Sequence, residues 1–138
     1  MKIVFCGSMS ESKKMIAAAK ELTGLGHNVV LPENTSDYAV MNNTDNVLAE
    51  SANIKINQDL IRGHYRKIDS SDAILVINVE RHGIKHYIGG NAFLEMGFAH
   101  ILHKPIYLLN NIPNISYRDE IVAMSPIILN NDLSNLSL

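Results

Sequence analysis

Glu95 is the residue of this chain that is best placed to do chemistry. It is the only Asp, Glu, Lys or Arg between Lys85 and Lys104, and the surrounding segment 92–102 is apolar on nearly every face, which predicts a buried helix. A buried carboxylate is costly unless it is paired or its pKa is raised. At a helix start after a glycine pair, such an acid suits a nucleophile or a general acid or base. The alternative is a structural glutamate that caps loop amides or pairs with an arginine, and the position favours the functional interpretation.

Two other side chains are weaker candidates. His64 lies on a predicted helix beside Tyr65, and if Tyr65 faces the core, His64 lies at the edge of that face toward the ligand site. Its position alone favours a partly exposed surface histidine. Cys6 could be a nucleophile, because a nearby helix start would lower its pKa, although a cysteine in such a place is more often small apolar filler.

Two glycine segments could cradle an anion: Cys6-Gly7-Ser8-Met9-Ser10 and Gly89-Gly90-Asn91. Small residues let backbone N–H groups approach a phosphate, and a helix N-terminus adds positive potential. Neither segment is a Gly-x-Gly-x-x-Gly fingerprint or a Walker loop, so each alone could be an ordinary turn. Neither contains a basic residue, and Lys13 and Lys85 are the nearest candidates.

Four histidines suggest a metal site, but the usual ligand spacings do not accompany them. No cysteine partner and no His-Glu-x-x-His motif is present. We therefore expect neither a metal nor another cofactor. The four are His82, His86, His100 and His103.

Short apolar runs that end at turn residues predict the strands that position these groups. They lie at residues 2–6, 27–32, 73–78, 105–109 and 126–129. Helical spacing of apolar residues predicts a first helix from Ser8 or Ser10 to Gly24 or Gly26, a second up to residue 68, the Glu95 helix, and a short one at 117–124. The second helix should present one face made of Ile54, Gln58, Ile61, Tyr65 and Ile68. Residues 33–49 read as a long polar loop of the kind that often binds ligands.

Strands that alternate with helices predict a parallel sheet with helices on both faces. Five strands joined by right-handed crossovers favour a flavodoxin- or Rossmann-like three-layer α/β/α sandwich with strand order 2-1-3-4-5. Ligands bind such sheets at the carboxyl ends of the strands, beside the switch between strands one and three. The segments that begin at Gly7, Asn78 and Gly89 converge there, so Glu95 should face the ligand.

Composition places these elements in one ordinary domain. The chain has 138 residues, 46% of them apolar, which is enough for a single core over 1–138 with a polar tail at 131–138. A net charge of −2 and the lack of a long basic run argue against nucleic-acid binding. A single cysteine, no apolar stretch near the roughly 18 residues of a membrane span, and no signal-peptide pattern predict a cytoplasmic protein without membrane contact.

Together these segments resemble the nucleoside 2-deoxyribosyltransferase-like family, which includes deoxyribosyltransferases and 2'-deoxynucleoside 5'-monophosphate N-glycosidases. Residues 4–8, Val-Phe-Cys-Gly-Ser, are similar to the family's first strand and phosphate-side loop, and residues 72–76 are similar to its third strand. Residues 89–99 resemble the helix whose glutamate attacks the anomeric carbon. Residues 121–125, which include Met124, resemble the segment by which one subunit completes its neighbour's site.

Two positions depart from the family pattern. The family commonly has a first-strand tyrosine that orients the glutamate, and Val4 stands there. It also has an aspartate eight residues before the acid that opens the third strand, and counting back from Asp72 (72 minus 8) gives His64. A histidine could donate a proton to a departing base near neutral pH. The replacement could equally mean that the reaction has been lost, as in related nucleotide sensors.

The resemblance implies cleavage or transfer of the N-glycosidic bond of a (deoxy)nucleoside or its 5'-monophosphate, with Glu95 as nucleophile and His64 as acid. The main alternative is a non-catalytic nucleotide-binding protein that uses the same site. A flavodoxin-like electron carrier is disfavoured, because, Tyr87 apart, the loops after strands one and three lack the aromatic residues that usually sandwich a flavin. Monophosphates should bind better than nucleosides. The expected ligand contacts are Cys6, Gly7, Ser8, Met9, Asn78, Gly89, Gly90, Asn91 and Met124.

The Glu95 helix and the second helix are apolar over wider arcs than one sheet face can cover. A two-fold homodimer that packs these helices together is the simplest closed solution, and two such dimers could form a tetramer. The family resemblance implies that Met124 then reaches the partner's site.

Overall fold

The computed structural model describes residues 1–33, 35 and 59–136. Its centre is a five-stranded sheet with the order β2-β1-β3-β4-β5, in which every pair of neighbours is parallel. This confirms the predicted α/β fold class and strand order. The strands are β1 (Lys2–Cys6), β2 (Asn28–Val30), β3 (Ala73–Val76), β4 (Ile106–Leu108) and β5 (Ile127–Ile128).

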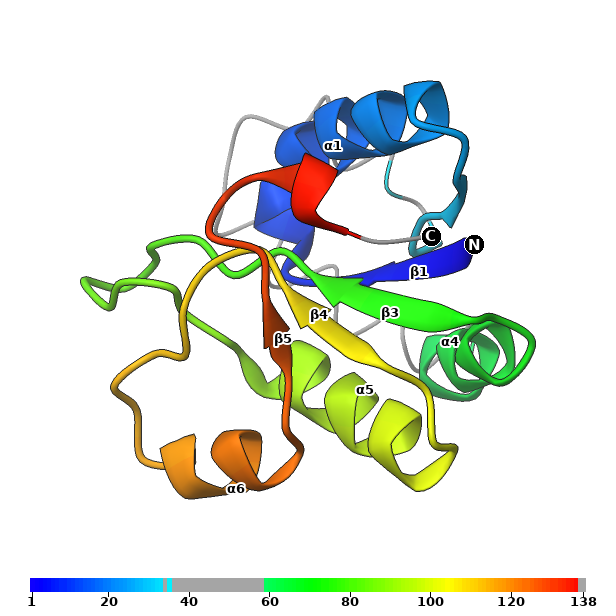
Figure 1. The fold of residues 1–138 in the computed structure, drawn as a ribbon. Coiled ribbons are helices and arrows are strands. Elements are labelled where there is room, and N and C mark those ends of the chain that lie inside the picture. Colours follow the sequence, from blue (N-terminus) through cyan, green and yellow to red (C-terminus); the bar gives the residue numbers. More distant parts are fainter. Residues whose placement is uncertain (34, 36–58, 137–138) are drawn as a thin grey trace.

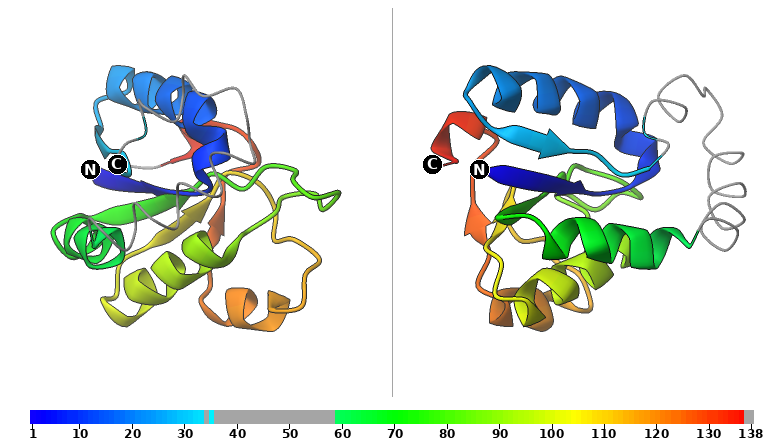
Figure 2. Two further views of the ribbon diagram at one scale, coloured as in Figure 1. Left: turned by 180° about the vertical axis from the view of Figure 1, so that it is seen from behind. Right: turned by 90° about the vertical axis from the view of Figure 1, so that its right-hand side faces the viewer.

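Helices cover both faces of the sheet (Figures 1 and 2). Helix α1 (Ser12–Gly24) lies on one face, and the short 3₁₀ helix η2 (Leu133–Asn135) packs against it. Helices α4 (Leu60–Asp69), α5 (Gly90–Ile101) and α6 (Arg118–Ala123) lie on the other face. The sheet therefore separates two apolar cores. Glu95, a residue of α5, lies on the side of the sheet that α4 and α5 cover.

The alternation of side chains along β1 decides which residues reach each core. Ile3 and Phe5 pack toward α1, whereas Val4 and Cys6 pack toward α4 and α5. All four are fully buried, as expected for a central parallel strand that is covered on both faces. Cys6 is the last residue of β1, and this alternation aims its thiol at the α4–α5 side.

Most predicted elements are present but shorter at their ends. The second strand, expected at residues 27–32, pairs only over 28–30, and the fifth keeps two residues. Ser8 caps a 3₁₀ turn, η1 (Met9–Glu11), that leads into α1. Ile54, Gln58 and nearly all of the predicted 33–49 loop lie outside the described residues.

The predicted face of the second helix is buried only in part. Ile68 of that face is buried, but Tyr65 and Ile61 are 38% and 47% exposed, and His64, whose position alone favoured the surface, is buried. Tyr65 instead meets Phe98 of α5 edge to face. An apolar-spacing rule misses this arrangement because it ranks tyrosine and isoleucine above histidine, whereas a paired imidazole can also be buried.

The C-terminal segment is more than the expected polar tail. Leu133 and Leu136 are buried beside α1 in the same core as Met15 and Leu22. Asp132 caps η2 by accepting a hydrogen bond from Ser134 N at 3.0 Å. Among the helices of the described ranges, none has both the length and the hydropathy needed to cross a bilayer.

Candidate functional site

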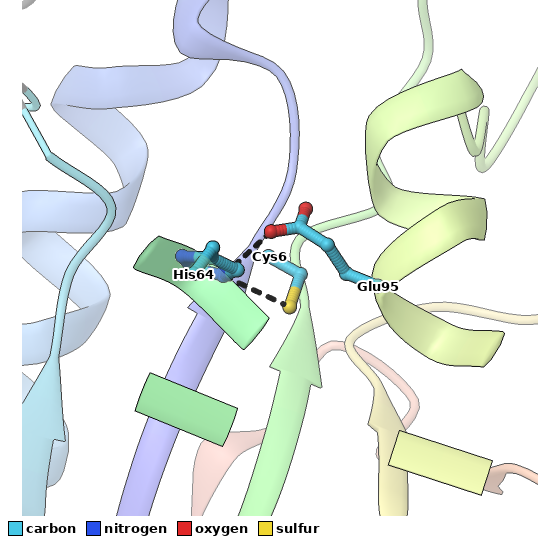
Figure 3. A group of neighbouring side chains, drawn as sticks. All are labelled: Cys6, His64 and Glu95. Atoms are coloured by element: carbon cyan, nitrogen blue, oxygen red, sulfur yellow. Dashed lines mark hydrogen bonds and ion pairs between the residues drawn. The ribbon is translucent and has the colours of Figure 1, made fainter. Parts of the chain in front are cut away.

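Three side chains meet where β1, α4 and α5 converge (Figure 3). His64 Nε2 lies 2.7 Å from Glu95 Oε2 and 3.6 Å from Cys6 Sγ. The side chains of His64 and Glu95 are only 8% and 14% exposed. Each of the three is a candidate from the sequence, and the structure brings them together.

The local sequence explains why Glu95 is there. Ala92, Met96 and Ala99 form the buried stripe of α5, and Glu95 lies beside it, one turn after Asn91. Helix α4 packs against α5 and turns His64 toward the carboxylate. The contact with His64 gives the carboxylate a polar partner, which offsets the cost of removing it from water.

The histidine contact leaves one carboxylate oxygen available. His64 Nε2 engages Oε2, and within the described residues no hydrogen bond reaches Oε1. A carboxylate held by one oxygen, in a side chain that lines a cavity, is suited to nucleophilic attack. His64 in its protonated form can also give up a proton at the same place.

A cavity of about 60 Å³ opens beside this pair. Its walls come from the turn after β1, from η1, from the residues that follow β2, and from α4 and α5. Of the predicted contact residues, Gly7, Met9 and Asn91 line it. The other residues in its walls are Pro32, Glu33, Leu60, Ile61, Leu94 and Phe98, together with His64 and Glu95.

Cys6 lies beneath the pair and not in the cavity wall. Its side chain is fully buried, and burial, reinforced by the negative charge of Glu95, raises the pKa of the thiol well above its usual value. The expectation that a helix start lowers this pKa is wrong, because loss of hydration outweighs any help from the helix. The structure therefore argues against Cys6 as a nucleophile.

Cys6→Ala should retain most of the wild-type turnover, because the thiol is neutral and has no access to substrate. The native thiol should also react with iodoacetamide at least tenfold more slowly than in the denatured chain, since only the thiolate is nucleophilic. Turnover of Cys6→Ala and the alkylation rate of the native protein check this. Loss of turnover in a folded Cys6→Ala variant would contradict it.

A second, smaller cavity of about 20 Å³ lies between the loop after β1 and the start of α5. Gly7 lines both cavities, so the two are adjacent. Of the expected ligand contacts, Ser8 and Gly89 also line the second one, and Gly90 is the first residue of α5. Arg81, which the sequence did not indicate, also lines it and donates a hydrogen bond to Ser8 Oγ. The only feature of the sequence that could have indicated Arg81 is its positive charge in the loop between β3 and α5.

Close packing explains two of the glycines. A Cβ on Gly7 would lie 2.6 Å from Met15 Cε, and a Cβ on Gly89 would lie 3.3 Å from Tyr87 Cε1. A larger residue at Gly7 would therefore displace the end of the Met15 side chain, which is buried in the core beneath α1. No such crowding surrounds Gly90.

Asn78, an expected ligand contact, lines neither cavity and instead holds two loops together. Its amide nitrogen donates to the carbonyls of Asn110 and Asn111 at 3.0 Å, and its Oδ1 accepts from Asn110 N at 2.9 Å. The side chain is fully buried and joins the loops that follow β3 and β4. Met124 packs against the core beside α6, and neither cavity includes it.

Within the described residues, Cys6, His64 and Glu95 are also the group that could hold a metal ion, since their ligand atoms lie within 4.8 Å of one another. The four histidines weighed in the sequence are not part of this group. The raised pKa of the thiol works against thiolate ligation, and Glu95 already has His64 as its partner.

No family model matches the chain, and no curated protein matches it in sequence. Among solved structures, a 2-deoxyribosyltransferase from the psychrotolerant bacterium Bacillus psychrosaccharolyticus matches with a TM-score of 0.50 and 18% identity. The match covers 78% of this chain and 71% of that one. The two chains share a fold. That enzyme is described as a biocatalyst for the synthesis of antiviral and antitumoral nucleosides.

Proposed function

We propose that this protein cleaves or transfers the N-glycosidic bond of a nucleoside or nucleotide, with Glu95 as the nucleophile. The contact that carries the proposal is the 2.7 Å pair between His64 and Glu95, largely buried beside a cavity at the carboxyl end of β1. The shared fold with a 2-deoxyribosyltransferase supports this class of substrate and a distant relationship to that family. The sequence resemblance, which rests on other observations, points the same way.

The first chemical step would be displacement of the base. Glu95 Oε1 attacks the anomeric carbon, the C–N bond breaks, and its electron pair leaves with the base. Protonated His64 supplies a proton to the departing nitrogen, so a neutral base is released. The sugar is then joined to Glu95 as an ester.

The second step would release the sugar. Water, or a second base, gives up a proton to His64 and attacks the anomeric carbon from the opposite side. The bond to Glu95 breaks with its electron pair, which restores the carboxylate. Before substrate binds, the contact with His64 also orients Glu95, a task that the family resemblance assigns to a tyrosine where this chain has Val4.

Release of free base from a panel of ribo- and deoxyribonucleosides and their 5'-monophosphates tests this function. We expect at least one N-glycoside to be hydrolysed, or to exchange its base when a second base is added. Turnover should be unchanged by EDTA, because the proposed steps need no metal. Full loss with EDTA and recovery with zinc would instead assign the Cys6–His64–Glu95 group to a metal.

A second function fits the same geometry. The direct pair between His64 and Glu95 satisfies both groups without substrate, as in a binding site that does not turn over. A protein that binds a nucleotide in this cavity but releases no base from any member of the panel would be a sensor.

The assembly proposed from the sequence is a homodimer with composite sites. Leu94 and Ile101 of α5 are 42% and 76% exposed, and Ile61 and Tyr65 expose apolar surface on the neighbouring α4. A second subunit that packs on these helices would remove that surface from water and bring Met124 toward the partner's cavity.

Light scattering should therefore give about twice the chain mass at micromolar concentration. Ile101→Glu should shift the mass toward the monomer, because it places a charge in the interface. Leu25→Glu at the end of α1, an exposed apolar position on the other face of the sheet, is the matched control and should remain dimeric. A monomeric wild-type protein with intact ligand binding would rule this assembly out.

A further inference from the structure

Cys6, His64 and Glu95 bring three different kinds of metal-ligand atom together (Figure 3). The thiol sulfur, a ring nitrogen and a carboxylate oxygen all lie within 4.8 Å of one another. The three side chains come from β1, α4 and α5, so the fold and not a local motif assembles them. The proposed reaction uses the imidazole and the carboxylate but gives the thiol no task.

The distances within this group are close to those around a tetrahedral zinc ion. Bonds of about 2.3 Å to sulfur and about 2.0 Å to nitrogen place the two ligand atoms about 3.5 Å apart. Cys6 Sγ lies 3.6 Å from His64 Nε2. His64 Nε2 and Glu95 Oε2 are 2.7 Å apart and would separate by about 0.6 Å around the same ion. Glu95 lines the larger cavity, which gives its side chain room for this movement.

The charges of the three ligands suit a divalent cation. A thiolate and a carboxylate balance its two positive charges, and a neutral imidazole adds none. This balance matters because Cys6 lies in an apolar core with Val4, Ile68 and Met96, where a net charge would be costly. The cavity beside His64 and Glu95 can supply a water as the fourth ligand, as in zinc sites with three protein ligands.

Burial of the thiol restricts the ions that can bind. The raised pKa of Cys6 keeps the thiol protonated in the presence of ions that bind sulfur weakly, such as Mg²⁺ and Ca²⁺. Zinc and cadmium bind a thiolate strongly enough to displace the thiol proton, which leaves to solvent. The proton between His64 and Glu95 leaves as well, so that a neutral imidazole and an anionic carboxylate face the ion.

We propose that Cys6, His64 and Glu95 bind a thiophilic divalent cation such as zinc, and that this ion inhibits the protein. The inhibition rests on the proposed function, because the ion occupies the carboxylate that attacks and the imidazole that donates the proton. Binding of the ion does not depend on that function. Zinc is then an inhibitor and not a resident cofactor, which agrees with the expectation that EDTA leaves turnover unchanged.

Titration with cadmium tests the site without any turnover, because a cadmium–thiolate bond has its own ultraviolet absorption band. Cys6 is the single cysteine of the chain, so the band reports this site alone. In reduced, EDTA-washed protein the band should saturate at about one ion per chain at micromolar concentration. Cys6→Ala should abolish the band and weaken zinc binding, measured against a chelating dye, roughly a hundredfold or more. A wild-type protein without the band would overturn the proposal.

Glu95→Gln distinguishes a three-ligand site from a thiol that binds an ion alone. The amide keeps the shape of the side chain but lacks the anionic oxygen, so zinc should bind roughly tenfold more weakly or worse. Glu80→Gln should match wild type. The double variant His100→Ala His103→Ala removes two exposed histidines at the end of α5 and should keep the cadmium band. Wild-type zinc affinity in Glu95→Gln would overturn the three-ligand site.

Inhibition of base release gives the second readout. Micromolar zinc should inhibit the wild-type protein, and EDTA should reverse the inhibition. Cys6→Ala keeps the catalytic pair but lacks one ligand, so it should need roughly tenfold more zinc or above for the same inhibition. Equal sensitivity of wild type and Cys6→Ala would overturn inhibition through this site. A cadmium band without base release would refute only the proposed reaction, whereas base release without the band would refute only the metal site.

Discussion

Glu95→Gln should lower turnover by roughly a thousandfold or more while changing ligand affinity little. The amide keeps the shape of the side chain and can still accept a hydrogen bond from His64, but it loses the negative charge that attacks the anomeric carbon. Steady-state rates of base release and calorimetric binding of the same nucleotide measure the two effects separately.

Glu80→Gln is the matched control, because it makes the same change on an exposed acid in the loop before α5. It should leave both turnover and binding near wild type. Near-normal turnover in Glu95→Gln would remove the nucleophile from the proposed mechanism and leave only the shared fold as support for the reaction.

His64→Gln should lower turnover about 100- to 10,000-fold, which is the usual contribution of a general acid. Glutamine can still donate a hydrogen bond to Glu95, so the variant keeps the orienting contact and loses only the titrating proton. His64→Ala should lose more, because it also leaves the largely buried carboxylate of Glu95 without its partner.

The pH profile separates these roles of His64. If the imidazole protonates the departing base, wild-type turnover should have a limb that falls toward alkaline pH, because the first step needs protonated His64. That limb should be absent in His64→Gln and unchanged in His100→Ala, which alters an exposed histidine of α5. A His64→Gln enzyme that keeps the wild-type limb would show that His64 only positions Glu95.

Regular patterns in the sequence predicted the layers of the fold and, within the site, Glu95. The apolar runs in β1 and β3 have no polar interruption, so their burial on both faces and the strand order followed from simple rules. Glu95 stood out because an isolated charge in an apolar helix needs a reason. His64 entered through a spacing shared with a known family, and its contact with Glu95 could not be derived from composition.

The missed features depend on tertiary contacts. The burial of His64 was missed because Tyr65 and Ile61 are more apolar than histidine, yet α5 offers a carboxylate that makes burial of the imidazole favourable. Arg81 lies in a loop with no periodic pattern, and only the fold brings it beside Ser8. The pKa of Cys6 depends on burial, which a list of its sequence neighbours does not convey.

The anomeric configuration of the first-formed product tests covalent catalysis by Glu95 most directly. With methanol as the acceptor, the product is a methyl glycoside that cannot equilibrate between anomers, and proton NMR during the first turnovers reads its configuration. Two successive displacements at one carbon, the first by Glu95 and the second by methanol, predict retention of the β-configuration of the substrate. A methyl α-glycoside would show a single displacement and contradict a glycosyl–Glu95 intermediate.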